Sequence, residues 1–211
     1  MVTEADIARA LLSIKAVFLR PEEPFTWASG IKSPIYCDNR LTLSYPEVRT
    51  LIDGAIADKI HELYPGCECI MGTATAGIAH AAIAADKLGL PMGYVRGSAK
   101  DHGRKNQIEG RVESGMKVVV VEDLISTAGS VLECVEPLRE AGCDVLGVVS
   151  IFTYGMQKAK DRLLDHGIEA ASLCDLDHLL PVAADEGYIS QDSTSRLLAF
   201  RDNPQDEGWM A

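Results

Sequence analysis

Residues 118–130 read Val-Val-Val-Val-Glu-Asp-Leu-Ile-Ser-Thr-Ala-Gly-Ser. The four valines predict a buried strand, two adjacent acids end it, and small and hydroxylated residues then lead into a helix. A turn of this kind points several backbone N–H groups at one spot near the positive end of the helix dipole, where a phosphate can bind. Acids at the end of the strand can hold ribose hydroxyls, directly or through a metal. The stretch therefore favours an α/β fold with a ribose-phosphate site over an ordinary strand-to-helix turn.

The composition is that of an ordinary globular protein. The chain has 211 residues, of which 47% are hydrophobic and 24% are charged, so we expect a single domain over residues 1–211. Its formal net charge of −11 makes it a poor candidate for nucleic-acid binding, which needs a cationic surface. No apolar run approaches the length of a membrane span, so no membrane partner is expected.

The N-terminal segment and the cysteines favour a cytoplasmic location. Residues 1–6 lack the basic start and the apolar core of a signal peptide. None of the six cysteines forms a CxxC pair, and Cys67 and Cys69 lie too close together for the usual zinc spacing. Free thiols in a reducing compartment are the expected state.

Strands and helices are expected to alternate along most of the chain. A capping pattern at Thr3 and Asp6 begins a first helix, and residues 21–43 indicate irregular structure with short strands. The apolar pattern then predicts strands at 69–71, 92–95, 117–121, 145–151 and 168–173, with helices at 46–64, 78–88, 130–141 and 156–166 and a last helical stripe near Leu176. Continuous apolar strands between helices indicate a parallel β-sheet flanked by helices on both faces.

Residues 97–115 form the longest polar segment and have no apolar period. Five cations or potential cations lie between Arg96 and Lys105, although the protein as a whole is acidic. A loop of this length without structure of its own is usually functional or disordered. Two interpretations follow: a glycine-hinged lid whose cations neutralise a leaving pyrophosphate, or a solvated charged loop.

A second loop of small residues, Gly72-Thr73-Ala74-Thr75-Ala76-Gly77, opens the helix expected at 78–88. Its backbone N–H groups can bind a phosphate. It is not a Walker A loop, because no Gly-Lys-Ser/Thr follows. Alone it is a weak signal, but with the 122–130 loop it provides two phosphate sites in one sheet.

Residues 25–38 read Phe-Thr-Trp-Ala-Ser-Gly-Ile-Lys-Ser-Pro-Ile-Tyr-Cys-Asp and precede the main sheet. An aromatic and hydroxyl-rich segment at this place can cover a planar base. The alternative is a packed N-terminal turn with no ligand.

Together these four segments closely resemble the orotate phosphoribosyltransferases, a family of the type I phosphoribosyltransferases. The Phe-Thr-x-x-Ser-Gly-x-x-Ser-Pro pattern from Phe25 and the Lys-Asp-His-Gly sequence from Lys100 are particular to that family among enzymes that use phosphoribosyl pyrophosphate (PRPP). The resemblance runs from about Phe25 to Ser130. It implies the type I phosphoribosyltransferase fold, with a five-stranded parallel sheet, a small hood formed mainly by about residues 1–43 and a core of about residues 44–211. It also implies Mg²⁺ as cofactor and a homodimer in which each lid serves the neighbouring subunit's site.

The resemblance also implies a role for each matching residue. Lys100, His102 and Asp123 would be catalytic, Asp123 would contact the metal mostly through the substrate, and Lys32, Tyr36 and Ser126 would bind orotate. Thr73, Ala74 and Thr75 would form the pyrophosphate loop. PRPP would be bound by Arg96, Lys100, His102, Glu122, Asp123, Leu124, Ile125, Ser126, Thr127, Ala128, Gly129 and Ser130.

The implied activity is transfer of the 5-phosphoribosyl group from PRPP to N1 of orotate, which gives orotidine 5′-monophosphate and pyrophosphate in UMP synthesis. Two alternatives stay open: a phosphoribosyltransferase acting on another base such as adenine, and a PRPP-binding regulator. The 25–38 segment argues against another base. The acidic composition and the intact lid sequence argue against a regulator that binds nucleic acid.

The sequence departs from the enterobacterial pattern of this family at several positions. Ala28 and Ala76 stand where that pattern has lysines, and Gly97 stands where it has a second cation. Thr153 or Tyr154 stands where it has an arginine that helps to hold orotate. Lys32, Arg104 and Lys105 are candidates to compensate, and the contacts to the orotate carboxylate stay open.

The remaining histidines have no paired ligands and are expected to be structural. They are His61, His80, His166 and His178.

Overall fold

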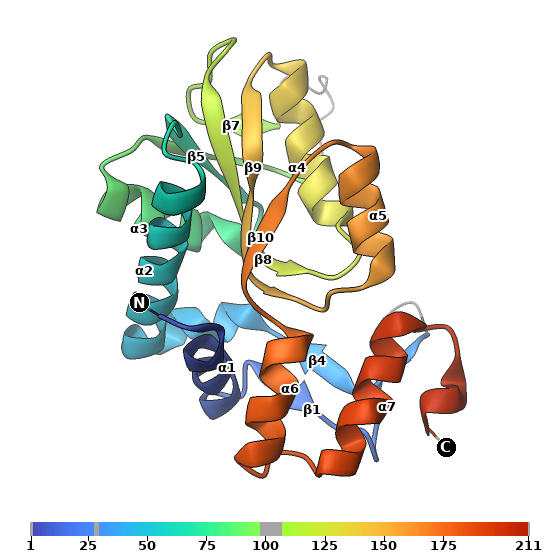
Figure 1. The fold of residues 1–211 in the computed structure, drawn as a ribbon. Coiled ribbons are helices and arrows are strands. Elements are labelled where there is room, and N and C mark those ends of the chain that lie inside the picture. Colours follow the sequence, from blue (N-terminus) through green and yellow to red (C-terminus); the bar gives the residue numbers. More distant parts are fainter. Residues whose placement is uncertain (1, 28–29, 98–106, 211) are drawn as a thin grey trace.

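The computed structural model describes residues 2–27, 30–97 and 107–210. Its centre is a six-stranded sheet in the order β10-β9-β8-β5-β6-β7 (Figure 1). The strands are β5 (Cys69–Thr73), β6 (Met92–Val95), β7 (Ile108–Glu109), β8 (Lys117–Ile125), β9 (Asp144–Thr153) and β10 (Ala170–Asp175). The five strands other than β7 run parallel, which confirms the expected fold class.

β7 was not predicted, because it lies in a polar segment without apolar alternation. It pairs antiparallel with β6, joining Tyr94 to Glu109 and Val95 to Ile108. Within the 97–115 segment, residues 108 and 109 therefore form a strand rather than a loop. They lie at the sheet edge beside β6, the strand that precedes the segment.

Helices cover both faces of the sheet, as the continuous apolar strands predict (Figure 1). Odd-numbered β8 valines, such as Val119, face a core shared with α2 (Pro46–Leu63) and α3 (Gly77–Leu88). Even-numbered ones, such as Val120, face a second core shared with α4 (Gly129–Glu140) and α5 (Gln157–Asp165). This alternation explains why four successive valines are all buried.

β8 is longer than the apolar run that predicts it. Its pairing with β9 continues past Val121, with Leu124 opposite Phe152 and Ile125 opposite Thr153. The two acids thus lie inside the strand rather than after it. Because β9 supplies the hydrogen-bonding partner for this extension, the sequence of β8 alone could not predict it.

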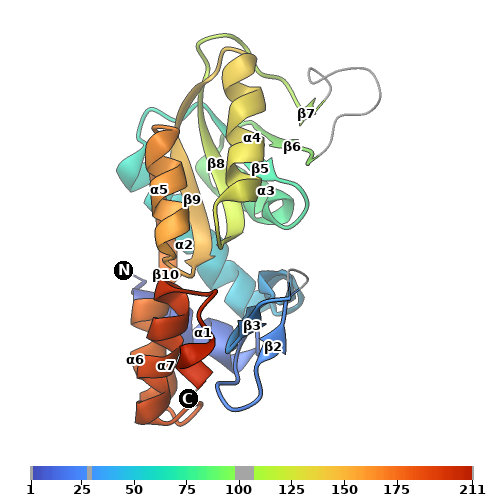
Figure 2. The same ribbon diagram turned by 90° about the vertical axis from the view of Figure 1, so that its right-hand side faces the viewer.

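A second layer lies below the carboxyl ends of the sheet strands (Figure 2). Its first part is N-terminal: α1 (Glu4–Ser13), β1 (Val17–Leu19), β2 (Phe25–Thr26), β3 (Lys32–Ser33), β4 (Ile35–Cys37) and the 3₁₀ helix η1 (Asn39–Ser44). Its second part is C-terminal: α6 (Leu176–Asp185), α7 (Gln191–Asp202) and η3 (Glu207–Met210). Of these C-terminal elements only α6 was predicted.

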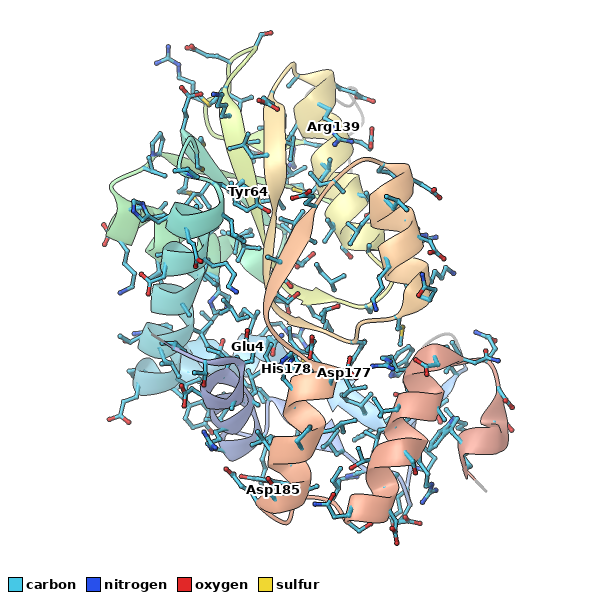
Figure 3. The ribbon with its side chains drawn as sticks, viewed as in Figure 1. Glu4, Tyr64, Arg139, Asp177, His178 and Asp185 are labelled. Carbon is cyan, nitrogen blue, oxygen red and sulfur yellow. The ribbon has the colours of Figure 1, made fainter. Side chains whose placement is uncertain are left out.

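Polar contacts connect the two ends of the chain within this layer. Arg9 of α1 forms an ion pair with Glu186 at 3.0 Å, and Arg196 of α7 forms one with Glu22 at 2.6 Å. Figure 3 shows Glu4 of α1 near His178 at the start of α6. The lower layer is therefore built from both ends of the sequence.

The end of α2 is fixed against the sheet by Tyr64, labelled in Figure 3. The Tyr64 ring lies where a side chain at Gly147 of β9 would otherwise be, so only glycine fits at that position. Among the described residues, no helix has both the length and the apolar character needed to cross a membrane.

Candidate functional site

The turn from β8 to α4 is shaped as an anion site. Ala128 adopts a left-handed conformation with φ 60°, which turns the chain sharply into the first residue of α4, Gly129. No side chain caps the N-terminus of α4. The first-turn N–H groups of a helix have no intrahelical partner, so they are available to a phosphate.

Two contacts hold this turn from outside, and neither was predicted. Arg162 of α5 donates a hydrogen bond from Nη1 to the carbonyl of Thr127 at 3.1 Å. The hydroxyl of Thr153 donates to the carbonyl of Ile125 at 3.0 Å. Nothing in the periodicity of α5 distinguishes Arg162 from a surface arginine, because the carbonyl that it binds lies 35 positions earlier in the chain.

The two acids of β8 differ in environment. Glu122 is only 4% exposed, and its Oε1 accepts hydrogen bonds from Thr73 Oγ1 at 2.6 Å and from the Asp123 backbone N–H at 2.9 Å. Burial, and then the neighbouring Asp123 carboxylate, raises the pKa of Glu122 to about 8. Asp123 is half-buried. At neutral pH Glu122 therefore keeps its proton.

This arrangement predicts that the free energy of unfolding of the ligand-free protein falls as pH rises from about 4.5 to about 8. The folded protein keeps a proton on Glu122 until its pKa of about 8, whereas the unfolded chain loses it near 4.5. The unfolded chain thus binds fewer protons in this window, so this contribution to stability is complete below pH 4.5 and is lost toward pH 8.

Glu122→Gln removes this titration. At about 1.4 kcal/mol per pKa unit, the wild type should lose on the order of a few kcal/mol relative to the variant across the window. Thermal unfolding of both proteins from about pH 5 to pH 8, without Mg²⁺ or substrate, measures the difference. Equal pH slopes for the two proteins would show that Glu122 ionises normally in the folded state.

In the loop predicted to bind pyrophosphate, residues 73–75, some polar groups already form hydrogen bonds within the protein. The hydroxyl of Thr73 is taken by Glu122, and the N–H of Ala74 donates to the carbonyl of Val95 at 3.0 Å. Thr75 is exposed, and no side chain caps the N-terminus of α3 that follows. The Thr75 carbonyl accepts from the N–H of Ile78 at 3.4 Å, so of the three predicted residues Thr75 is the one whose exposed hydroxyl is best placed to meet a ligand.

Gly77 at the start of α3 lies tightly against β8. A Cβ atom there would collide with the Val121 carbonyl and with Thr73 Oγ1. The absence of a side chain thus lets the start of α3 approach the middle of β8 closely.

The predicted lid residues are only partly described. Arg96 follows β6, and its Nε lies 3.2 Å from Glu109 Oε1 of β7. This ion pair fixes the guanidinium at the edge of the sheet. Lys100 and His102 lie outside the described residues, as do Arg104 and Lys105.

A pocket of about 450 Å³ opens beside the β8 strand end. Its walls are mainly aromatic, and Trp27 and Tyr154 stack with ring centroids 5.9 Å apart and an interplanar angle of 26°. Such walls suit a planar ring. The lining residues are Phe25, Thr26, Trp27, Tyr36, Cys37, Leu124, Ser126 and Tyr154.

The structure brings the three predicted orotate residues to this pocket in different ways. Tyr36 and Ser126 line it directly. Lys32 lies at the rim, where its Nζ donates to Thr26 Oγ1 at 2.7 Å. At the end of β9, Tyr154 faces the pocket, whereas the hydroxyl of Thr153 is turned to the phosphate turn.

Asn39 is a further residue that the sequence did not single out. It is fully buried, and its Nδ2 donates to the backbone carbonyl of Asp123 at 2.6 Å. No local pattern predicts this contact, because the two residues are 84 positions apart.

No three histidine, cysteine or acidic side chains of the described residues gather as a ready-made metal cage. Mg²⁺ bound with a phosphate substrate usually needs only one or two carboxylates, because phosphate oxygens and water complete its shell. Asp123, half-buried beside the phosphate turn, fits that requirement.

Comparisons with known proteins agree with the fold described above. A family profile described as a phosphoribosyl transferase domain matches residues 43–169. An orotate phosphoribosyltransferase of Bacillus cereus (strain G9842) is 58% identical over 205 residues, covering 97% of this chain and 98% of that protein. The orotate phosphoribosyltransferase structure from Aeropyrum pernix has a TM-score of 0.75 at 29% identity, over 87% of this chain and 99% of that one. The structure of Leishmania donovani UMP synthase has a TM-score of 0.80 at 28% identity, over 94% of this chain and 42% of that one.

Proposed function

This chain belongs to the orotate phosphoribosyltransferases. We propose that three adjoining parts of its site bind the ribose 5-phosphate, the pyrophosphate and the base in their reaction. In that reaction N1 of orotate attacks the anomeric carbon of PRPP, the configuration inverts and pyrophosphate leaves. The products are orotidine 5′-monophosphate and pyrophosphate. The observation that carries the proposal is that the phosphate turn and the aromatic pocket share one strand end, since Ser126 belongs to both.

The first part is the turn from Ser126 to Ser130, which binds the 5′-phosphate through backbone N–H groups at the start of α4. Asp123 then faces the ribose hydroxyls, with Glu122 beside it. The ribose ring takes on positive charge as pyrophosphate departs, so a fixed carboxylate stabilises the transition state more than the ground state. Because Glu122 holds a proton at neutral pH, Glu122 itself adds no charge beside the ribose.

The second part binds pyrophosphate. Thr75, with its exposed hydroxyl, and Arg96, at the end of β6, are its described members. The support for Lys100 and His102 is the family resemblance of the Lys-Asp-His-Gly sequence. Negative charge grows on the leaving group, so cations placed there act mainly in the transition state.

The third part is the aromatic pocket, which takes the planar base. Lys32 at its rim is proposed to hold the orotate carboxylate, because it is a cation bonded to a residue of the pocket wall. Lys32 would then supply the positive charge that Ala28, Ala76 and Thr153 lack.

Mg²⁺ is proposed as the cofactor, held mostly by the pyrophosphate and ribose oxygens of PRPP, with Asp123 as the protein group. When bound, the ion neutralises phosphate charge. Asp123 keeps its place in the site through the protein's own contacts, chiefly the hydrogen bond that its carbonyl accepts from Asn39.

The assembly proposed is one domain, with residues 1–43 as the main part of the hood, and two such chains in a dimer with shared lids. Leu41 and Tyr45 support a subunit interface, since they are neighbouring large apolar side chains with exposed fractions of 37% and 45%. Light scattering should give twice the chain mass of 22.8 kDa. A cytoplasmic location is supported by the six cysteines, all of which are free.

Purified protein mixed with PRPP, Mg²⁺ and orotate should consume orotate and form one pyrophosphate for each orotidine 5′-monophosphate. The loss of orotate absorbance measures the rate, and adenine and uracil are the comparison bases. Turnover of another base in place of orotate would overturn the assignment of the pocket. Binding of PRPP without any turnover would instead indicate a regulator.

A further inference from the structure

We infer that a buried hydrogen-bonded chain from Asp53 through His80 and Thr42 to Asn39 positions Asp123 for turnover. The inference rests on the proposed role of Asp123 at the ribose. It concerns four side chains that do not touch the substrate, so they are positioning residues. Their exposed fractions are all 0%.

The chain of contacts is continuous across four elements of the fold, α2, α3, η1 and β8. Asp53 of α2 lies 2.5 Å from His80 of α3, measured between Oδ1 and Nδ1. His80 Nε2 lies 3.2 Å from the hydroxyl oxygen of Thr42 in η1. That hydroxyl lies 2.6 Å from the backbone carbonyl of Asn39, whose Nδ2 reaches the Asp123 carbonyl at 2.6 Å.

The chemistry of the groups fixes the direction of these bonds. A backbone carbonyl only accepts, so Thr42 donates its single hydroxyl proton to Asn39 and Asn39 donates from its amide nitrogen to Asp123. The Thr42 oxygen is then left to accept, which requires a hydrogen on His80 Nε2. The contact between His80 Nδ1 and Asp53 Oδ1 completes the series.

Exchanging the positions of the nitrogen and oxygen of the Asn39 amide would break the hydrogen bond to Asp123. In the opposite orientation its oxygen would face the Asp123 carbonyl, and two acceptors would meet. In the present one, Oδ1 accepts from the Cys37 thiol at 3.3 Å, and Cys37 lines the aromatic pocket. Asn39 thus connects the wall of the base pocket to the backbone that carries the ribose carboxylate.

A purely structural role does not explain this arrangement well. Asp53 Oδ2 is buried and has no hydrogen-bond partner among the described residues, and a half-satisfied buried carboxylate is costly. Well-packed apolar residues at these positions would hold α2 and α3 together at lower cost. What apolar residues cannot do is fix the main chain at Asp123 by a directed bond, and that is where the series ends.

The test compares Thr42→Val, which removes the hydroxyl and keeps the shape, with Thr42→Ser, which keeps the hydroxyl. If Thr42 positions Asp123, Thr42→Val should lower kcat by about tenfold or more, because a small misplacement of a reacting group is enough for such a loss. The KM for PRPP should change by less than about threefold, because the phosphate turn itself is untouched. Thr42→Ser should restore most of the kcat. Asn39→Asp, which puts an acceptor in place of the donor, should reproduce the loss.

Ile56→Val is the matched control for stability. Ile56 is fully buried in the same helix as Asp53 but makes no polar contact, so its loss of a methyl group weakens packing alone. If Ile56→Val lowers kcat as much as Thr42→Val does, at a similar shift in Tm, then Thr42 is merely structural.

A double variant separates positioning from any other effect. In an Asp123→Asn background, Thr42→Val should cost much less than it does in the wild type, because the charge that it positions is already gone. If the fold-loss in kcat of the double variant equals the product of the two single losses, the inference is wrong. These outcomes are distinct from a failure of the proposed function, which would appear first as wild-type protein that does not turn over orotate.

Discussion

Asp123→Asn should lower kcat by about tenfold to a thousandfold while the protein stays folded. The substitution keeps the size of the side chain and removes its charge, at the point where the ribose becomes positive in the transition state. The backbone carbonyl that accepts from Asn39 is unchanged, so the position of the residue is kept. Steady-state rates with orotate and PRPP, together with a thermal unfolding curve, measure the effect.

Asp144→Asn is the matched control for this variant. It makes the same chemical change at the exposed first residue of β9, at the opposite end of the sheet from the site. Its rates should equal those of the wild type. Wild-type kinetics in folded Asp123→Asn protein would show that the acid is structural and that another group stabilises the ribose.

Phe200→Ala should give the largest loss of stability, about 3–5 kcal/mol in the free energy of unfolding. Phe200 is 1% exposed and packs edge-to-face on both Trp27 and Trp209, with ring centroids 5.6 Å and 5.7 Å away. Removing its ring leaves a cavity behind the wall of the aromatic pocket. We therefore also expect a higher KM for orotate with little change in the KM for PRPP. Urea unfolding and substrate titrations measure the two effects.

Leu164→Ala removes an apolar side chain of similar class from the surface of α5, where Leu164 is 79% exposed. Its effect on stability should stay within about 0.5 kcal/mol. Equal changes in both KM values for Phe200→Ala would indicate a general loosening of the fold rather than a local loss of the base pocket.

The part of the fold that the sequence predicts is the part that local chemistry determines. Buried parallel strands need continuous apolar residues, and a phosphate turn needs small residues before a helix, so the apolar part of β8 and the turn can be predicted from neighbouring residues alone. The Phe25 segment was interpreted either as a cover for a base or as a packed turn, and the structure places Trp27 and Tyr36 in a pocket next to that turn. Binding of a base there stays a prediction.

What the sequence could not predict depends on partners far along the chain. α7 buries Ser193, Leu197 and Phe200 on one face, a stripe with too few apolar residues to be recognised as a core helix. His80 was expected to be structural and Asn39 was not singled out, and only the contacts between η1, α3 and β8 give them a common environment. The roles of Lys100 and His102 stay predictions that rest on the resemblance.

The joining of both chain ends in the lower layer has a consequence for how the protein is made. The phosphate turn has all its contacts once Arg162 has left the ribosome, whereas Trp27 waits for Phe200 and Trp209 to cover it. At synthesis rates of about 5–20 residues per second, the 48 residues from Arg162 to Met210 take roughly 2–10 s. During that interval the nascent chain exposes a tryptophan that the finished protein covers, and such exposed apolar surface is what chaperones that act during translation bind.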